Sequence, residues 1–215
     1  MDILVLTGYD DNMQELGDIC LPSKRAYAER HGYAFECVRE YPKDVHPSWH
    51  KLQLLRDRID KYDAIFWLDA DTIVTRGSIK IIPAPQGNPV LSASADWCSD
   101  TDGPDEMPSM GNFILCNTDE TQQWIDLAMQ QVQFKNRPMW EQQAVQKCIK
   151  ENHWFRNRVF IQPRRLFNAV HTTCTPHGKP PGAPWQPGDF LIHLTGVENR
   201  IELAKEFAAW ALKNA

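Results

Sequence analysis

The feature that constrains this chain most is an apolar run, residues 65–74, that carries two acidic residues near its middle. The run reads IFWLDADTIV, with Asp69 and Asp71 as its only charged side chains. Its density of β-branched and aromatic residues predicts a strand buried on both faces. Because an unpaired carboxylate is very costly to bury, we expect both acids at the C-terminal end of that strand, at the edge of a sheet.

The spacing of the two acids suggests their role. Side chains two residues apart on an extended chain point the same way, so Asp69 and Asp71 can reach one hard cation. Mg²⁺ and Mn²⁺ are usually held by one or two carboxylates together with a substrate phosphate. The structural alternative is that one Asp caps a turn while the other forms an ordinary salt bridge. The partners found downstream favour the metal site.

The N-terminal part of the chain predicts a strand–helix–strand unit. A short strand at 3–6 is followed by a helix over about 13–31 and by an alternating strand at 33–38. This order favours a parallel sheet in an α/β fold. Ligands bind such sheets at the carboxyl ends of the strands. Thr7 and Tyr9 follow the first strand, so they are candidate ligand contacts; the alternative is a plain turn.

The rest of the chain predicts further alternating elements. A helix is expected from Lys51, which either faces an anionic ligand or lies in solvent. The polar stretch 96–110 is typical of a lid or binding loop. We expect strands at 90–95, 111–118, 158–161, 167–170 and 189–196. Three helices are also expected: one that ends near Gln133, one that begins at Glu141 and one that begins near Val197. In the first of these, the side chains expected to face inward are Trp124, Leu127, Ala128 and Val132. No internal repeat or linker separates them, so a single domain is predicted.

Composition narrows the classes of function. The formal charge of −5 argues against a broad nucleic-acid-binding surface. The six cysteines show no C-x-x-C spacing, which indicates buried thiols in a reducing compartment. No apolar run approaches 18 residues, and no basic segment precedes the first strand. We therefore expect a cytoplasmic protein without a transmembrane segment or signal peptide.

A histidine near the C-terminus completes the predicted metal site. His193 follows an apolar strand and precedes Thr195 and Gly196, where the backbone can approach a ligand closely. A lone histidine in this setting is usually structural. Beside two aspartates we predict it as a third ligand, which favours Mn²⁺ over Mg²⁺.

Taken in order, these motifs resemble those of metal-dependent glycosyltransferases of the GT-A fold. KLQLLR at 51–56 followed by WLDAD at 67–71 is similar to glycosyltransferase family 34, which includes α-galactosyl-, α-xylosyl- and α-mannosyltransferases. MGNFIL at 110–115 resembles its acceptor-side strand, and EQQAV at 141–145 its acidic-Gln helix start. His193-x-x-Gly196 resembles a motif shared with family 8.

The resemblance implies an α/β fold of the GT-A, Rossmann-like type, with a mostly parallel central sheet flanked by helices. It implies one domain over residues 1–215, with a nucleotide-binding half at about 1–75 and an acceptor-binding half at about 76–215. The implied reaction is retaining transfer of a hexose or pentose to a glycan or other hydroxyl acceptor. A UDP-sugar is favoured as the nucleotide-sugar donor, with a GDP-sugar as the alternative.

The resemblance also assigns roles on the donor side of the site. Mn²⁺ or Mg²⁺ on the donor diphosphate would be held by Asp69, Asp71 and His193. Residues implied near the nucleotide sugar are Thr7, Tyr9, Lys51, Asp69 and Gly196. Arg200 either contacts phosphate or is an exposed residue in the first turn of its helix.

On the acceptor side, Gln142 would lie beside the anomeric carbon, with its carbonyl oxygen facing the developing positive charge. Glu141 would orient the acceptor or Gln142, or simply cap its helix. Residues implied to contact substrate are Trp97, Gly111 and Asn112. Trp97 either stacks on a sugar or anchors its own loop.

Two other functions remain open from the residues. DADT at 69–72 also looks like the first motif of haloacid-dehalogenase-type phosphatases, with Asp69 as the nucleophile. In that family the motif normally ends the first strand, whereas at least two strands precede it here. The second alternative is a non-catalytic module that binds a sugar nucleotide or glycan. Gln142 and His193 argue against that module.

Overall fold

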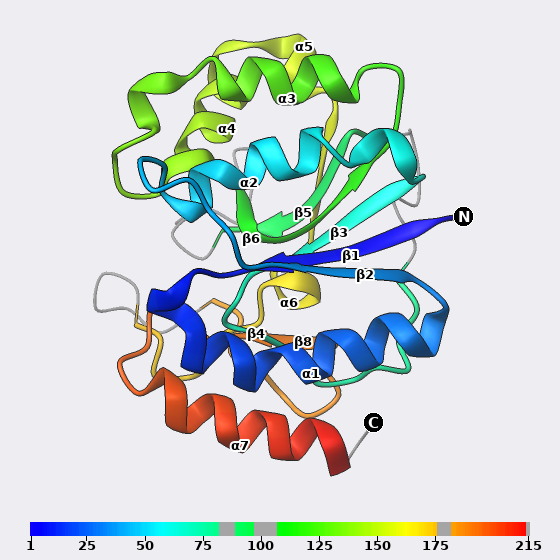
Figure 1. Cartoon of the computed structure of the whole chain (residues 1–215), viewed down its shortest axis with the longest axis vertical. Helices are drawn as coiled ribbons and strands as arrows, with labels where there is room; N and C mark the ends of the chain where they lie inside the picture. The colour runs from blue at the N-terminus through cyan, green and yellow to red at the C-terminus, as the bar shows by residue number, and fades with distance from the viewer. Residues whose placement is uncertain (82–88, 97–106, 176–181, 214–215) are drawn as a thin grey trace.

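The computed structural model describes residues 1–81, 89–96, 107–175 and 182–213. A central sheet lies between two sets of helices (Figure 1). The described strands of the chain are β1 Ile3–Gly8, β2 Ala34–Val38, β3 Ala64–Leu68, β4 Thr72–Val74, β5 Leu91–Ala95, β6 Pro108–Cys116, β7 Val159–Gln162 and β8 Leu191–His193; β4 and β8 form a separate two-stranded sheet. Its α-helices are α1 Gln14–His31, α2 Pro47–Arg56, α3 Thr121–Met129, α4 Trp140–Glu151, α5 His153–Arg156, α6 Arg164–Phe167 and α7 Arg200–Lys213.

The main sheet has the strand order β2-β1-β3-β6-β5-β7. β1 is parallel to β2 and β3, and β7 is parallel to β5, whereas β6 runs antiparallel between β3 and β5. The C-terminal ends of β1 and β3 therefore share one edge of the sheet. Leu68 pairs with Asn112, so β6 brings its N-terminal half to the same edge. This arrangement confirms the predicted α/β class.

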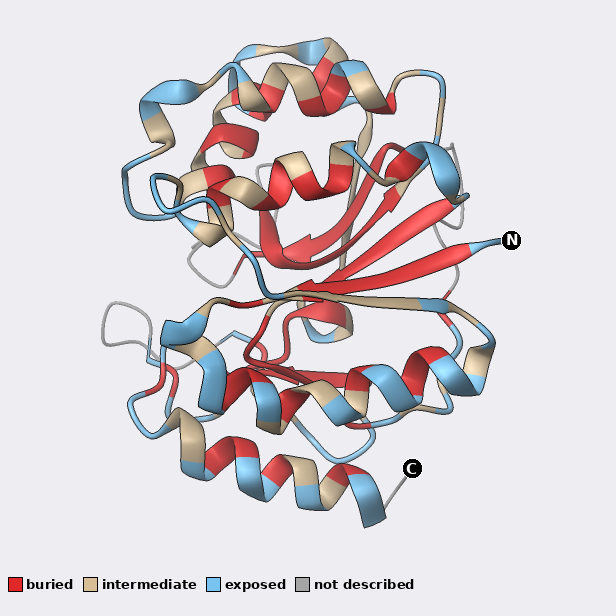
Figure 2. Ribbon diagram, viewed as in Figure 1, coloured by how far each residue is buried: buried red, intermediate tan, exposed pale blue. Residues whose placement is uncertain are grey.

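Both faces of the central strands are buried (Figure 2). Leu6 and Trp67 pack with residues of α2, α3 and α4 on one face. Val5 and Phe66 pack with Tyr27 of α1 on the other. Helices α2 to α5 cover the first face, and α1 and α7 lie on the opposite side (Figure 1). The prediction of a strand buried on both faces is confirmed for β3.

The apolar run at 65–74 is not one strand, as expected, but two. β3 ends at Leu68, a turn follows, and β4 pairs antiparallel with β8 in a separate two-stranded sheet. The Thr72 amide donates to the Asp69 carbonyl across this turn at 3.1 Å. The expectation that the two acids point the same way from an extended chain was therefore wrong. A turn, rather than the alternation of a strand, sets their directions.

Three other expectations were wrong in detail. The helix with Lys51 begins earlier, at Pro47, because proline suits a first helical turn. Helix α3 ends at Met129, and Val132, expected inward, lies beyond it with 67% of its surface exposed. The strand expected at 167–170 is absent; residues 164–167 form α6, which begins directly after Pro163, and Val170 makes isolated bridges.

The cysteines Cys20, Cys37, Cys116, Cys148 and Cys174 are free thiols, and Cys98 lies outside the described residues. Burial raises the pKa of the Cys20 thiol to about 12, as expected for an unreactive buried cysteine. In the described parts of the chain, no helix combines the length and apolar character needed to cross a bilayer.

Candidate active site

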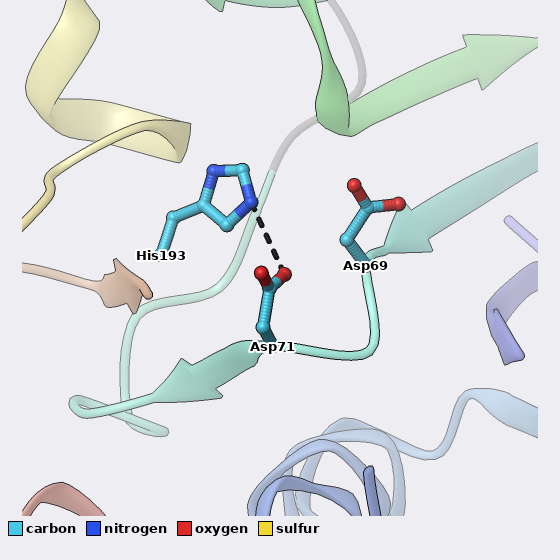
Figure 3. A group of neighbouring side chains, drawn as sticks. All are labelled: Asp69, Asp71 and His193. Carbon is cyan, nitrogen blue, oxygen red and sulfur yellow. Dashed lines mark ion pairs between the residues drawn. The ribbon is translucent and has the colours of Figure 1, made fainter. Parts of the chain in front are cut away.

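The structure brings together the three predicted metal ligands (Figure 3). Asp69 follows β3, Asp71 precedes β4, and His193 ends β8. The pairing of Thr72 with His193 places the histidine beside the turn. One potential ligand atom from each of the three side chains lies within 4.8 Å of the others. Residues far apart in the sequence thus form one cluster at the edge of the sheet.

The imidazole ring of His193 is oriented by Asn168, a residue that was not predicted from the sequence. Its Nδ1 lies 2.9 Å from Asn168 Oδ1, and its Nε2 lies 3.3 Å from Asp71 Oδ1. An amide oxygen only accepts, so Nδ1 carries the proton and Nε2 faces the carboxylates. Burial opposes charge on both partners, but their attraction outweighs it. The pKa of His193 is raised, and that of Asp71 is lowered to about 2.

Asp69 is held with one oxygen engaged and the other directed toward His193. Its Oδ1 accepts from Trp67 Nε1 at 2.6 Å and lies 3.0 Å from Lys51 Nζ. A methyl group at Gly111 would lie 3.2 Å from Asp69 Oδ2 and 2.5 Å from His193 Cε1. Two oriented carboxylates and one imidazole nitrogen are a donor set that fits Mn²⁺, and Mg²⁺ less well.

Gly111 lies directly against the imidazole, so its role is to leave space for His193. We predict that Gly111→Ala tilts the ring and weakens Mn²⁺ binding by about 10–100-fold, the range seen when groups supporting a metal ligand are changed. Gly77→Ala is the matched control, because its new methyl group would meet its nearest atom at 3.8 Å. Calorimetric titration with Mn²⁺ measures the effect. Equal affinity in the two variants would contradict this role.

A buried lysine of α1, which was also not predicted from the sequence, stabilises the turn between β3 and β4. Lys24 of α1 is fully buried, and its Nζ donates to the carbonyls of Asp69 at 2.6 Å and Ala70 at 3.2 Å. It also donates to Thr7 Oγ1 at 3.2 Å. Burial lowers the pKa of Lys24. The sequence does indicate the burial of Lys24, because Lys24 is four residues from both Cys20 and Ala28 and so shares their buried helical face.

Two residues expected to contact ligand are instead internal. Thr7 is fully buried and bonded to Lys24. Asn112 is 1% exposed; its Oδ1 accepts from Thr72 Oγ1 at 2.8 Å, and its Nδ2 donates to the Phe167 carbonyl at 3.0 Å. Their polar atoms are engaged by the protein itself. Asn112 braces the turn and Thr7 accepts from the lysine beneath it.

Lys51 is not a solvated surface residue, which was one of the two expectations for it. It is 3% exposed, and its Nζ donates to Glu141 Oε1 at 2.7 Å and to the Met110 carbonyl at 2.6 Å. Burial opposes its charge, but the two carboxylates of Asp69 and Glu141 raise the pKa of Lys51. Glu141 therefore pairs with Lys51 from the first turn of α4.

Burial raises the pKa of Glu141 from 4.5 to about 7, and Lys51 only partly offsets this. The folded state then binds more protons than the unfolded state between these pH values, so stability falls as pH rises through the window. We predict that Glu141→Gln removes a fall on the order of 2–3 kcal/mol between pH 5 and 8. Urea unfolding of both proteins in EDTA measures it. Parallel pH curves would contradict the prediction.

The side-chain amide of Gln142 is hydrogen-bonded through both its oxygen and its nitrogen. Its Oε1 accepts from the Met110 amide at 2.9 Å, and its Nε2 donates to Asp96 Oδ2 at 2.9 Å. The side chain of Gln142 in α4 thus links the end of β5 to β6, because it contacts the Asp96 carboxylate after β5 and the backbone amide of Met110 in β6. Trp97, the next predicted substrate contact, lies outside the described residues.

A cavity of about 490 Å³ adjoins the cluster. Its described lining includes the predicted residues Tyr9, Lys51, Asp69, Asp71 and Arg200, together with Gly8, Asp10, Asn12, Met13, Tyr41, His46, Pro47, Ser48, Trp67, Ala70, Trp140 and Thr195. The predicted residues Thr7, Gly111, Asn112, Glu141, Gln142, His193 and Gly196 are not in this lining.

Arg200 lines this cavity, and Gly196 makes the turn that precedes its helix. Arg200 Nη1 lies 3.6 Å from Asp71 Oδ2, so a guanidinium group faces the space beside the carboxylates. Gly196 has a φ of 68°, which favours glycine, and it makes the turn between β8 and α7. The cavity therefore combines the cluster of two carboxylates and an imidazole with a guanidinium group, an arrangement suited to a diphosphate.

Comparison with known sequences agrees with this geometry. Residues 1–83 match glycosyltransferase family 34, the galactosyl transferase GMA12/MNN10 family. An uncharacterised α-1,2-galactosyltransferase of Schizosaccharomyces pombe is 26% identical over 85% of this chain and 63% of its own length. The probable α-1,6-mannosyltransferase MNN10 of Saccharomyces cerevisiae is 24% identical over 77% of this chain and 48% of its own. The chain thus spans about half to two thirds of these relatives.

Solved structures resemble the whole chain. A glycosyltransferase involved in glycosylation of the major capsid of PBCV-1 superposes with a TM-score of 0.69 at 15% identity, covering 97% of this chain and 100% of the other. The galactosyltransferase LgtC, solved with donor and acceptor sugar analogues, gives 0.63 at 16%, covering 99% and 96%. The chain is a GT-A fold protein whose first 83 residues match the galactosyl transferase GMA12/MNN10 family.

Proposed function

We propose that this protein is a metal-dependent glycosyltransferase that moves a hexose from a nucleotide sugar, with a UDP-sugar favoured, to a hydroxyl acceptor with retention of configuration. The observation that carries the proposal is the Asp69–Asp71–His193 cluster at the edge of a large cavity in a GT-A fold. The names of the galactosyl- and mannosyltransferase relatives support hexosyl over pentosyl transfer. The nucleotide-binding half would be residues 1–75, and the acceptor-binding half residues 76–215.

The described residues suit the demands of this reaction. When bound, Mn²⁺ or Mg²⁺ would neutralise charge on the diphosphate leaving group. Asp69, Asp71 and His193 would hold that cation, and Arg200 would add positive charge beside the phosphates. The acceptor hydroxyl would pass its proton to the departing phosphate oxygen, so no separate base is required.

Glu141 and Gln142 would support this site from behind. Glu141 holds Lys51 against Asp69, and Gln142 holds the Met110 amide beside them. The carbonyl oxygen of Gln142 has two lone pairs, of which Met110 uses one. In this proposal the second lone pair provides the dipole toward the anomeric carbon.

A thermal-shift screen of UDP- and GDP-sugars, each with Mn²⁺, Mg²⁺ or EDTA, tests the proposal. A ligand that binds only the folded state stabilises it by mass action. We expect one nucleotide sugar to raise the melting temperature, and only with metal. Release of the nucleoside diphosphate in the presence of acceptor then separates an enzyme from a binding module. No response to any nucleotide sugar would contradict the proposal.

A further inference from the structure

The segment after β2 places a tyrosine hydroxyl against the end of β1. A methyl group at Gly8, the last residue of β1, would lie only 2.2 Å from Tyr41 Oη. Gly8, Tyr41 and Asp69 all line the cavity beside the Asp69–Asp71–His193 cluster. The absence of a side chain at Gly8 therefore lets this hydroxyl reach the donor side of the cavity.

The ring of Tyr41 is packed, but no described residue forms a hydrogen bond with its hydroxyl. The ring packs against the core cluster shared by α2 and β3, and it meets the His50 ring edge-on at 5.8 Å. Tyr9, the other tyrosine of the cavity lining, donates its hydroxyl to Asp18 Oδ1 at 2.6 Å. Among the described residues, Tyr41 Oη has no such hydrogen-bond partner. Burial raises the pKa of Tyr41, so the group stays a neutral donor and acceptor.

The position of the hydroxyl indicates which part of a ligand it meets. Neighbouring strands lie about 5 Å apart, and β1 is the direct neighbour of β3, which ends beside Asp69. Tyr41 Oη, at the end of β1, thus lies about one strand spacing from the Asp69 carboxylate at the end of β3. Lys51 lies between Asp69 and Glu141 and forms an ion pair with each of them. A ribose joined directly to a phosphate at the cluster would extend over the end of β1.

We propose that the Tyr41 hydroxyl hydrogen-bonds to a ribose hydroxyl of a nucleoside diphosphate whose phosphates lie at the Asp69–Asp71–His193 cluster. This inference rests on the proposed function and extends it, because it assigns a residue that distinguishes ribonucleotides from deoxyribonucleotides. A site built to bond a hydroxyl rejects the analogue that lacks it. Tyr41 would therefore contribute to donor affinity through one neutral hydrogen bond.

The test is calorimetric binding of UDP and GDP, with their 2′-deoxy and 3′-deoxy analogues, to the intact chain in Mn²⁺. Wild-type protein should bind one deoxy analogue about 3–10-fold more weakly than the ribonucleotide, the effect of one neutral hydrogen bond. Tyr41→Phe should bind the ribonucleotide more weakly by a similar factor and lose the discrimination. Its melting temperature should match that of wild type, because the packed ring is kept.

Tyr33→Phe is the matched control, since Tyr33 lies outside the cavity lining and its hydroxyl is buried. It should bind all the nucleotides as wild type does. Tyr41→Phe that retains both affinity and discrimination would overturn the role of Tyr41 while leaving the proposed function intact. Wild-type protein that binds no nucleoside diphosphate with metal would overturn the proposed function as well, so the two failures are distinct.

Discussion

Asp71→Ala is expected to lose metal-dependent binding of the nucleotide sugar and at least about a hundredfold in kcat/KM. Changing a residue that merely supports a metal ligand already costs about 10–100-fold, and Asp71 is placed as a ligand itself. The fold should survive. Asp71 attracts His193 and Arg200, but His193 can give up its proton and Arg200 can reach solvent. Lys24, a buried cation that Asp71 also attracts, keeps its hydrogen bonds to the Asp69 and Ala70 carbonyls.

Titration with Mn²⁺ and measurement of transfer by the same preparations would check this result. Asp119→Ala is the matched control, because Asp119 is exposed and far along the chain from the cluster. Near-ultraviolet circular dichroism would establish that both variants are folded. Metal-dependent affinity that is the same in Asp71→Ala as in the control would remove Asp71 from the site.

Lys51→Met should cost about 3–5 kcal/mol of unfolding free energy, the range for breaking a buried ion pair by removing one partner. Lys51 and Glu141 are both almost completely buried, at 3% and 4% exposure. Without the lysine, Glu141 must take up a proton or remain charged without a partner. Asp69 would also lose one of the two donors that orient its Oδ1. The variant should therefore be less stable and bind metal with a less ordered carboxylate.

Urea unfolding at pH 8, where wild-type Glu141 is mostly ionised, measures this cost. Lys147→Met is the matched control, because Lys147 pairs with Glu151 on the surface of α4 and such pairs contribute about 0–1 kcal/mol. The double variant Lys51→Met/Glu141→Gln should recover part of the loss, since it leaves no buried carboxylate behind at position 141. Equal costs for the two lysine variants would show that Lys51 is not a buried partner.

Local patterns in the sequence were sufficient to predict the α/β class and the elements that carry the site. The apolar run before Asp69 predicted β3, because continuous burial on both faces leaves a pattern that needs no distant partner. The polar residues at the ends of apolar segments also marked Asp69, Asp71 and His193, which the fold brings within 4.8 Å. These inferences depended on neighbouring residues alone.

Tertiary contacts decided how the site is built. Lys24 reaches the Asp69 carbonyl across 45 residues of sequence, and Lys51 reaches the Met110 carbonyl across 59, so no local pattern could show that each is buried among oxygens. Gln142 is engaged by Met110 of β6 and by Asp96, which directly follows β5. Gly111 is needed because an imidazole from β8 packs against it. Whether a polar side chain faces a ligand or the protein depends on which groups packing places beside it, and those groups come from distant segments.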